Sequence, residues 1–190
     1  MGCWSSTVFI SSLALAALGL AGCSSHSGLP VYNTVPEFKL TDQSGSVFDS
    51  SKLANHVWVA DFMFTNCPGP CPRMSSQMRQ VQTALAVAEV KLVSFTIDPE
   101  RDTPKVLEDY SIRYAARPGV WYFLTGPVPV LNHLDHDVFQ LGAIDGTLDH
   151  STRFVLVDRK SRIRGYYLTS EPNAITTLIA DAKDLLRERS

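Results

Sequence analysis

The segment HVWVADFMFT, residues 56–65, is a nearly continuous run of apolar, aromatic and β-branched side chains. A strand that faces water on one side alternates apolar and polar residues, whereas a strand covered on both sides does not. The run therefore predicts a central, fully buried strand. Such a strand needs layers packed on both faces of its sheet.

Strand-like and helical segments alternate along the rest of the chain. Residues 37–53 alternate apolar and polar side chains around DQSGS, which is typical of a hairpin. Further strands are predicted at 90–98, 120–126, 152–158 and 163–169, and helical patterns at 71–88, 103–117, 128–142 and 171–189. This order predicts an α/β fold: a three-layer domain with a mixed central sheet and an N-terminal β-hairpin.

The N-terminal region has the pattern of an export signal. The apolar run from Val8 to Leu20 is shorter than the roughly 20 residues that span a bilayer. It ends in LAGC, which resembles a bacterial lipobox and predicts lipidation of Cys23. We therefore expect a lipoprotein signal peptide at 1–22, a tether at 23–36 and a domain at 37–190, exported and anchored in a membrane by lipid, facing the periplasm or another extracytoplasmic space. A plain secretory signal or an uncleaved anchor is the alternative, because the first residues carry no Lys or Arg.

Processing at this site would leave one cysteine pair for the domain. Of the four cysteines, Cys3 would leave with the signal and Cys23 would carry lipid, so that Cys67 and Cys71 remain. A disulfide between them would close a very short loop and add little stability. The pair is therefore expected to serve chemistry rather than structure. The net charge of -2 gives no indication of nucleic-acid binding.

The residues around the pair predict its local setting. Pro68 and Pro70 between the cysteines and Pro72 after them restrict the turn, and a helix is expected to start near Pro70 or Cys71. The positive end of that helix would lower the pKa of a thiol there. Gly69 would allow a backbone angle that other residues resist. We expect two sulfur atoms held close on a rigid, partly exposed rim, as a redox pair or as part of a metal site.

The motifs resemble those of known families. Asp61 precedes Cys67 by six residues, as in the thioredoxin superfamily, although the spacing here is Cys-x-x-x-Cys. The motifs DFMFTNCPGPCPRM, FTIDPERDTP, WYFLTG and DHSTRFVLVD together resemble the SCO/SenC family over about residues 36–187. The resemblance implies a thioredoxin-like fold, with the lipobox in place of the more usual transmembrane anchor.

The resemblance also implies a site and a function. In that family, two motif cysteines and a later histidine bind copper, which correspond here to Cys67, Cys71 and His150. The implied cofactor is copper, as Cu(I) and also Cu(II), since thiolates select Cu(I) and imidazole suits the oxidised ion. The implied role is maturation of the CuA centre in a subunit of cytochrome c oxidase, as a copper donor, a thiol reductant or both. A hydrogen bond from His150 to Asp149 is the alternative reading of that histidine.

The sequence is also compatible with other functions. The main alternative is a general extracytoplasmic thiol–disulfide oxidoreductase with no obligatory copper role. A peroxidase of the peroxiredoxin type usually has Thr-x-x-Cys, and Thr65 lies one residue too close to Cys67. A closed zinc site would need a fourth ligand.

Three further groups of polar residues carry expectations of their own. Asp61 is expected either to tune proton transfer behind the cysteines or to be a buried structural acid. Asp98 and Asp102 are expected to shape a strand-to-helix turn. His133 and His136 are expected on a solvated helix face beside Asp135 and Asp137.

Overall fold

The computed structural model describes residues 28–87, 89–142 and 151–188. Within this part, eight strands form one mixed sheet in the order β1-β8-β7-β4-β5-β6-β2-β3. The strands are β1 (Asn33–Thr34), β2 (Lys39–Asp42), β3 (Val47–Asp49), β4 (Trp58–Met63), β5 (Lys91–Thr96), β6 (Trp121–Thr125), β7 (Arg153–Val157) and β8 (Arg162–Leu168). The parallel β4, β5 and β6 form the centre, and the expected N-terminal hairpin is the β2–β3 pair.

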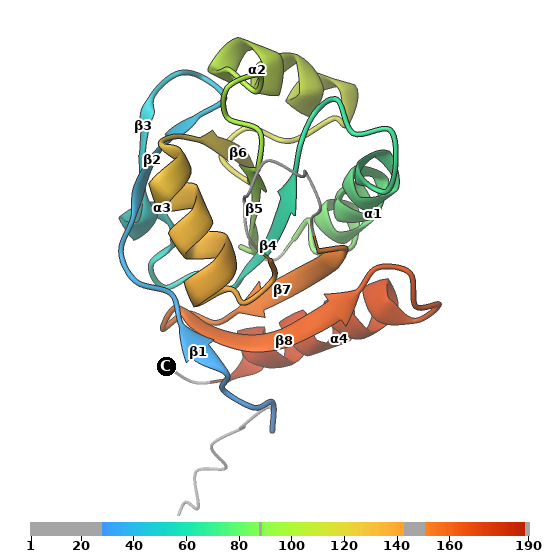
Figure 1. Cartoon of the computed structure of the whole chain (residues 1–190). Coiled ribbons are helices and arrows are strands. Elements are labelled where there is room, and N and C mark those ends of the chain that lie inside the picture. Colours follow the sequence, from blue (N-terminus) through green and yellow to red (C-terminus); the bar gives the residue numbers. More distant parts are fainter. Residues whose placement is uncertain (1–27, 88, 143–150, 189–190) are drawn as a thin grey trace, which may run out of the picture.

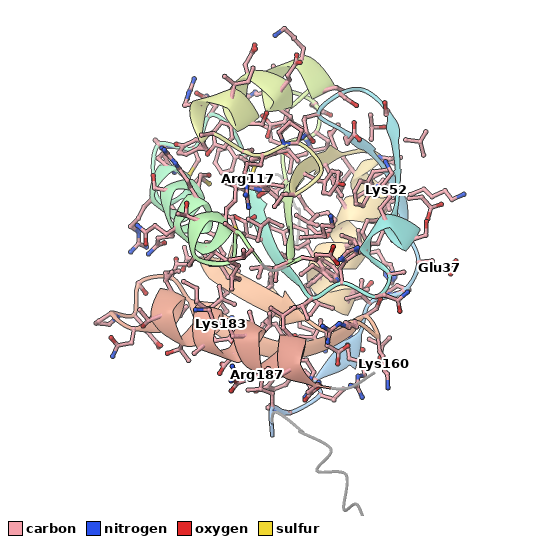
Figure 2. The ribbon with its side chains drawn as sticks, turned by 180° about the vertical axis from the view of Figure 1, so that it is seen from behind. Glu37, Lys52, Arg117, Lys160, Lys183 and Arg187 are labelled. Atoms are coloured by element: carbon pink, nitrogen blue, oxygen red, sulfur yellow. The ribbon has the colours of Figure 1, made fainter. Side chains whose placement is uncertain are left out.

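Helices cover both faces of this sheet. They are α1 (Cys71–Ala84), α2 (Pro104–Arg113), α3 (Val128–Asn132) and α4 (Ala174–Arg187), with the short turns η1 (Ser50–Leu53) and η2 (His133–Val138). Figure 1 shows α3 in front of the sheet, whereas α4 lies in front in the reversed view of Figure 2, where Lys183 and Arg187 mark its outer face. The three-layer α/β arrangement expected from the sequence is confirmed.

The side chains of β4 show why both layers are needed. All six residues of β4 are buried, as the nearly continuous apolar run predicts. Trp58 and Phe62 pack against Phe139, which follows η2, with ring centroids 6.0 and 5.6 Å apart. Asp61 and Met63 point to the opposite face because side chains alternate along a strand. The α1 residues Met74 and Met78, four positions apart on one helix face, are fully buried.

The sheet extends further toward the N-terminus than the expected boundary at residue 37. β1 pairs with β8, and the carbonyl oxygens of Leu29 and Pro30 accept hydrogen bonds from the guanidinium of Arg164. That buried cation also contacts Asp158 at 2.8 Å and Glu188 at 3.1 Å. Residues 28–36 of the expected tether therefore pack on the domain.

The segment after β6 also differs in detail from the expected single helix over 128–142. A short α-helix passes into the π-helical turn η2, in which Phe139 N donates to Leu134 O. None of the helices in the described residues is both long and apolar enough to cross a bilayer.

Candidate metal and thiol site

The two cysteines lie where a central strand ends and a helix begins. β4 ends at Met63, and α1 begins at Cys71 with Pro70 as its N-cap residue, so the expected helix start is confirmed. Met74 N donates to Pro70 O at 2.9 Å in the first turn. Cys67 lies in the turn between these elements, at the carboxyl end of a parallel strand, where sites form in open α/β sheets.

Both thiols are buried, so the expected partly exposed rim is wrong. Cys71 is 0% exposed and Cys67 is 9% exposed, and the two sulfur atoms are not joined by a disulfide. Burial raises the pKa of Cys71, and a side-chain hydrogen bond with Cys67 raises it further, while a backbone hydrogen bond involving Phe64 acts in the opposite direction. For Cys71, the first residue of α1, burial therefore acts against the lowered pKa expected for a thiol at a helix N-terminus.

The turn between the cysteines does not depend on an unusual glycine angle. Gly69 is absent from the described glycines with positive φ, which are Gly28, Gly45 and Gly119. A Cβ atom at Gly69 would lie 3.9 Å from the Cys67 sulfur, an ordinary contact. The special backbone role expected for Gly69 is therefore wrong, and the three prolines are the residues that restrict this turn.

A buried polar chain lies on the same face of the sheet as α1. Asp61 is 1% exposed and accepts a hydrogen bond from Ser94 Oγ at 2.6 Å, and Ser94 Oγ accepts one from Trp121 Nε1 at 3.0 Å. Burial raises the pKa of Asp61 to about 7, although the Ser94 hydrogen bond lowers it. The negative charge of Asp61 also raises the pKa of Cys71. The carboxyl group is therefore close enough to affect the Cys71 thiol electrostatically.

Asp102 reaches the cysteine turn from a distant loop. Its carboxylate accepts hydrogen bonds from the backbone N–H and the hydroxyl of Thr65, two residues before Cys67. It also accepts one from the Thr96 hydroxyl at the end of β5. The sequence predicted only that Asp102 shapes a turn. Its place within the motif FTIDPERDTP was the one sequence feature that pointed to a further role.

The remaining candidate ligand lies elsewhere in the chain. His150 falls outside the described residues, and within residues 28–87, 89–142 and 151–188 no group of three His, Cys, Asp or Glu side chains could hold a metal ion. The described donors are therefore the two thiols, a soft pair that fits Cu(I).

The histidines on η2 are solvated, as expected. His133 and His136 are exposed, and the Nδ1 atoms of both rings contact the Asp137 carboxylate, at 2.8 and 2.7 Å. Asp135 differs from the expectation, because it is 2% exposed and burial raises its pKa to about 6. Only part of this acidic and histidine-rich segment therefore faces solvent.

Comparison with known proteins identifies what this arrangement resembles. A family model described as SCO1/SenC matches residues 28–187. The SCO1 protein homolog of Bacillus subtilis strain 168 is 37% identical over 99 residues, and this match spans about half the length of each chain, 51% in both cases.

Solved structures agree with this match. A SCO1/SenC family lipoprotein from Bacillus anthracis has a TM-score of 0.74 and 31% identity, covering 80% of this chain and 95% of its own. BsSco, from a Sco family of cytochrome c oxidase assembly proteins, has a TM-score of 0.75 and 28% identity, covering 86% and 100%. The copper-bound ScoI of Bradyrhizobium japonicum shares the fold, with a TM-score of 0.65 and 24% identity over 78% and 96%. The thioredoxin-like architecture and the family resemblance expected from the sequence are confirmed.

Proposed function

The chain belongs to the SCO1/SenC family, and on that premise we propose that it binds copper for the maturation of the CuA centre of cytochrome c oxidase. The observation that carries the proposal is a buried dithiol: Cys67 and Cys71 are reduced and joined by a hydrogen bond where β4 leads into α1. Thiolates select Cu(I) among biological metals. Support also comes from the assembly role named for BsSco and from the copper bound to ScoI.

Copper is the cargo in this proposal, held by Cys67 and Cys71 with His150 as the third ligand. Both thiols must lose a proton to bind the ion, so binding competes with protons and releases them. Burial of Cys71 shields the pair from water, which favours a soft, weakly hydrated ion over a hard one. Thiolates of the acceptor would replace these ligands to take the copper. Cu(II) would use the same residues, because imidazole and thiolate both suit it.

A thiol-reductase role is the second candidate, favoured by the unequal exposure of the two cysteines. The more exposed Cys67 would attack a disulfide in the acceptor and form a mixed disulfide. Cys71 would then attack Cys67, releasing the acceptor with two thiols and leaving a Cys67–Cys71 disulfide. The acceptor gains two electrons and two protons, which the dithiol loses. In the disulfide form the pair could no longer bind copper.

Anchoring follows from the N-terminal motif. We propose that lipid on Cys23 anchors the domain to a membrane on its extracytoplasmic side, where cytochrome c oxidase carries CuA. The description of the B. anthracis relative as a lipoprotein supports this placement. The acceptor would then be a subunit in the same membrane.

Copper binding by single variants tests the proposal. Reduced protein is titrated with Cu(I) in competition with a chromophoric chelator, for the wild type and for Cys67→Ala, Cys71→Ala and His150→Ala. We expect equimolar copper in the wild type, loss of binding in both cysteine variants and weaker binding in the histidine variant. His133→Ala, an exposed histidine, is the matched control and should match the wild type. Unchanged affinity and spectrum in His150→Ala would remove that residue from the ligand set.

A second assay separates the two roles. The disulfide-bonded CuA domain of an oxidase subunit is mixed with reduced protein, and the appearance of its thiols is followed over time. A pure reductase does not need His150, so an unchanged rate in His150→Ala together with unchanged copper binding favours the oxidoreductase reading. A loss of copper binding with an unchanged rate would assign the histidine to copper alone.

A further inference from the structure

The carboxylate of Asp102 joins two loops at the carboxyl edge of the sheet. Asp102 lies in the turn between β5 and α2, immediately before the N-cap residue Thr103, and is 1% exposed. Its hydrogen bonds go to Thr65, which follows β4, and to Thr96, which ends β5. Because β4 and β5 are parallel neighbours with Met63 opposite Thr96, these two strand ends meet beside the carboxylate.

The donors around Asp102 account for its burial. An ionised carboxylate is costly to remove from water unless hydrogen bonds replace the lost hydration. Thr65 supplies its backbone N–H, at 3.1 Å from Oδ2, and its hydroxyl, which is directed to Oδ1. The Thr96 hydroxyl donates to Oδ2. Asp102 N donates to Asp98 O at 2.9 Å and closes the turn, which holds the backbone of Asp102 in place.

These contacts act on the cysteine turn from one side. Thr65 precedes Cys67 by two residues, and α1 begins at Cys71, so Cys67 lies on a short segment held at both ends. The prolines of the turn limit how far this segment can rearrange. From this arrangement we propose that Asp102 is a positioning residue: it acts through Thr65 to keep the Cys67 sulfur beside the Cys71 sulfur.

Two measurable equilibria depend on that proximity. A dithiol that is already close chelates a soft ion better, and it also forms its disulfide more readily, because each thiol is present at a high effective concentration for the other. The second equilibrium is protein dithiol plus oxidised glutathione giving protein disulfide plus two reduced glutathiones. Loss of the Asp102 contacts should lower the affinity for Cu(I) and shift the glutathione equilibrium toward the dithiol. The measurement of copper affinity rests on the proposed function, whereas the measurement of the glutathione equilibrium does not.

The test compares substitutions at both ends of the contact. Asp102→Asn keeps the shape but replaces one accepting oxygen by a donor, Thr65→Val removes the hydroxyl, and Thr65→Ser retains it. Asp98→Asn is the matched control, because the Asp98 side chain lies in the same turn but contacts Arg101. Full-length reduced protein is equilibrated with glutathione buffers, and free thiols are counted by alkylation. The Cu(I) affinity is measured by chelator competition.

We expect Asp102→Asn to weaken Cu(I) binding by about tenfold, within the range of roughly 10- to 100-fold found for residues that orient metal ligands. The glutathione equilibrium should shift about tenfold toward the dithiol, equal to about 30 mV for this two-electron couple. Thr65→Val should move both quantities in the same direction by less. Thr65→Ser and Asp98→Asn should match the wild type.

A purely structural Asp102 would give a different result. Asp102→Asn would then melt at a lower temperature, while its copper affinity and glutathione equilibrium stayed within twofold of the wild type, and the proposal would be wrong. If that variant does not fold, the Thr65→Val and Thr65→Ser pair decides by itself. A wild type that binds no copper would refute the proposed function, yet the glutathione equilibrium would still decide the role of Asp102.

Discussion

Asp61 on β4 and Ser94 on β5 lie directly opposite each other in the parallel pair, and the Ser94 hydroxyl donates to Asp61 Oδ1 at 2.6 Å. The other carboxylate oxygen, Oδ2, is buried and has no hydrogen-bond partner in the described part of the chain. One hydrogen bond does not replace the hydration that an ionised carboxylate loses on burial. The pKa of Asp61 is therefore raised from 3.8 to about 7.

Replacing this acid should change how stability depends on pH. In the unfolded chain Asp61 ionises near pH 4, whereas in the folded protein it ionises near pH 7. Its stabilising contribution is therefore complete below pH 4 and is lost as the pH rises to 7. We expect the wild type to lose at most about 4 kcal/mol over this window relative to Asp61→Asn. Urea unfolding of the reduced, copper-free proteins between pH 4 and 8 measures the difference. Asp109→Asn, on the exposed side of α2, is the control, and parallel curves for all three proteins would contradict the prediction.

Removing the buried guanidinium of Arg164 should destabilise the domain strongly. The change Arg164→Ala leaves Asp158 and Glu188 without their buried partner and frees the carbonyl groups of Leu29 and Pro30. Breaking a buried ion pair in this way costs about 3–5 kcal/mol. The exposed pair of Arg187 and Asp184 provides the control, because Arg187→Ala should cost less than about 1 kcal/mol. If urea unfolding shows the same loss of unfolding free energy in Arg164→Ala and Arg187→Ala, the buried contacts of Arg164 contribute no more to stability than a surface ion pair.

A methyl group should be tolerated at Gly69 and not at Gly165. At Gly69 the added Cβ would meet only the Cys67 sulfur, at 3.9 Å, so Gly69→Ala should change the unfolding free energy by less than about 0.5 kcal/mol. At Gly165 the added Cβ would lie 2.6 Å from Tyr167 Oη, which donates to Asp181. Overpacking there should cost about 1–3 kcal/mol. Thermal unfolding compares the two, and a large loss in Gly69→Ala would restore a special backbone role for that glycine.

The two thiols should differ in their rate of alkylation. Cys71 is fully buried and its pKa is raised by that burial, so little reactive thiolate is present and the reagent must reach it through the fold. We expect Cys67→Ser, which keeps Cys71, to react with iodoacetamide at least about tenfold more slowly than Cys71→Ser. Mass spectrometry of quenched samples gives both rates. Equal rates would argue against Cys67 as the attacking thiol of the reductase reading.

Copper should stabilise the reduced protein and not the oxidised one. A ligand that binds only the folded state adds about 2.7 kcal/mol at a hundred times its dissociation constant. For a chain of this size, that energy corresponds to a rise in Tm of roughly 5–10 °C. Calorimetry with and without Cu(I), and again after a chelator has removed it, measures the effect. A similar rise in the disulfide form would indicate that copper binds somewhere other than the cysteine pair.

Several features followed from the sequence because they depend on local periodicity. The nearly continuous apolar run over residues 56–65 predicted a central strand, and α1 was expected to start near Pro70 or Cys71, as it does. The helical pattern predicted over 103–117 likewise located α2, which begins at Pro104 with the Thr103 side chain accepting from Val106 N. Such patterns can be read without knowing what packs against them, because the alternation of strands and the spacing of helices are properties of neighbouring residues.

Burial and long-range pairing were decided only by the tertiary structure. The thiols expected on a partly exposed rim are buried in the folded domain, and no local pattern reports that depth. The contact of Asp102 with Thr65 spans 37 positions and that of Arg164 with Pro30 spans 134. A chain determines which segments become strands and helices largely by itself, but the hydration lost by each polar group depends on the elements that cover it. For this reason the sequence determined the identity of the cysteine pair, and the packed structure determined the pKa of Cys71 and the support of the turn that holds Cys67.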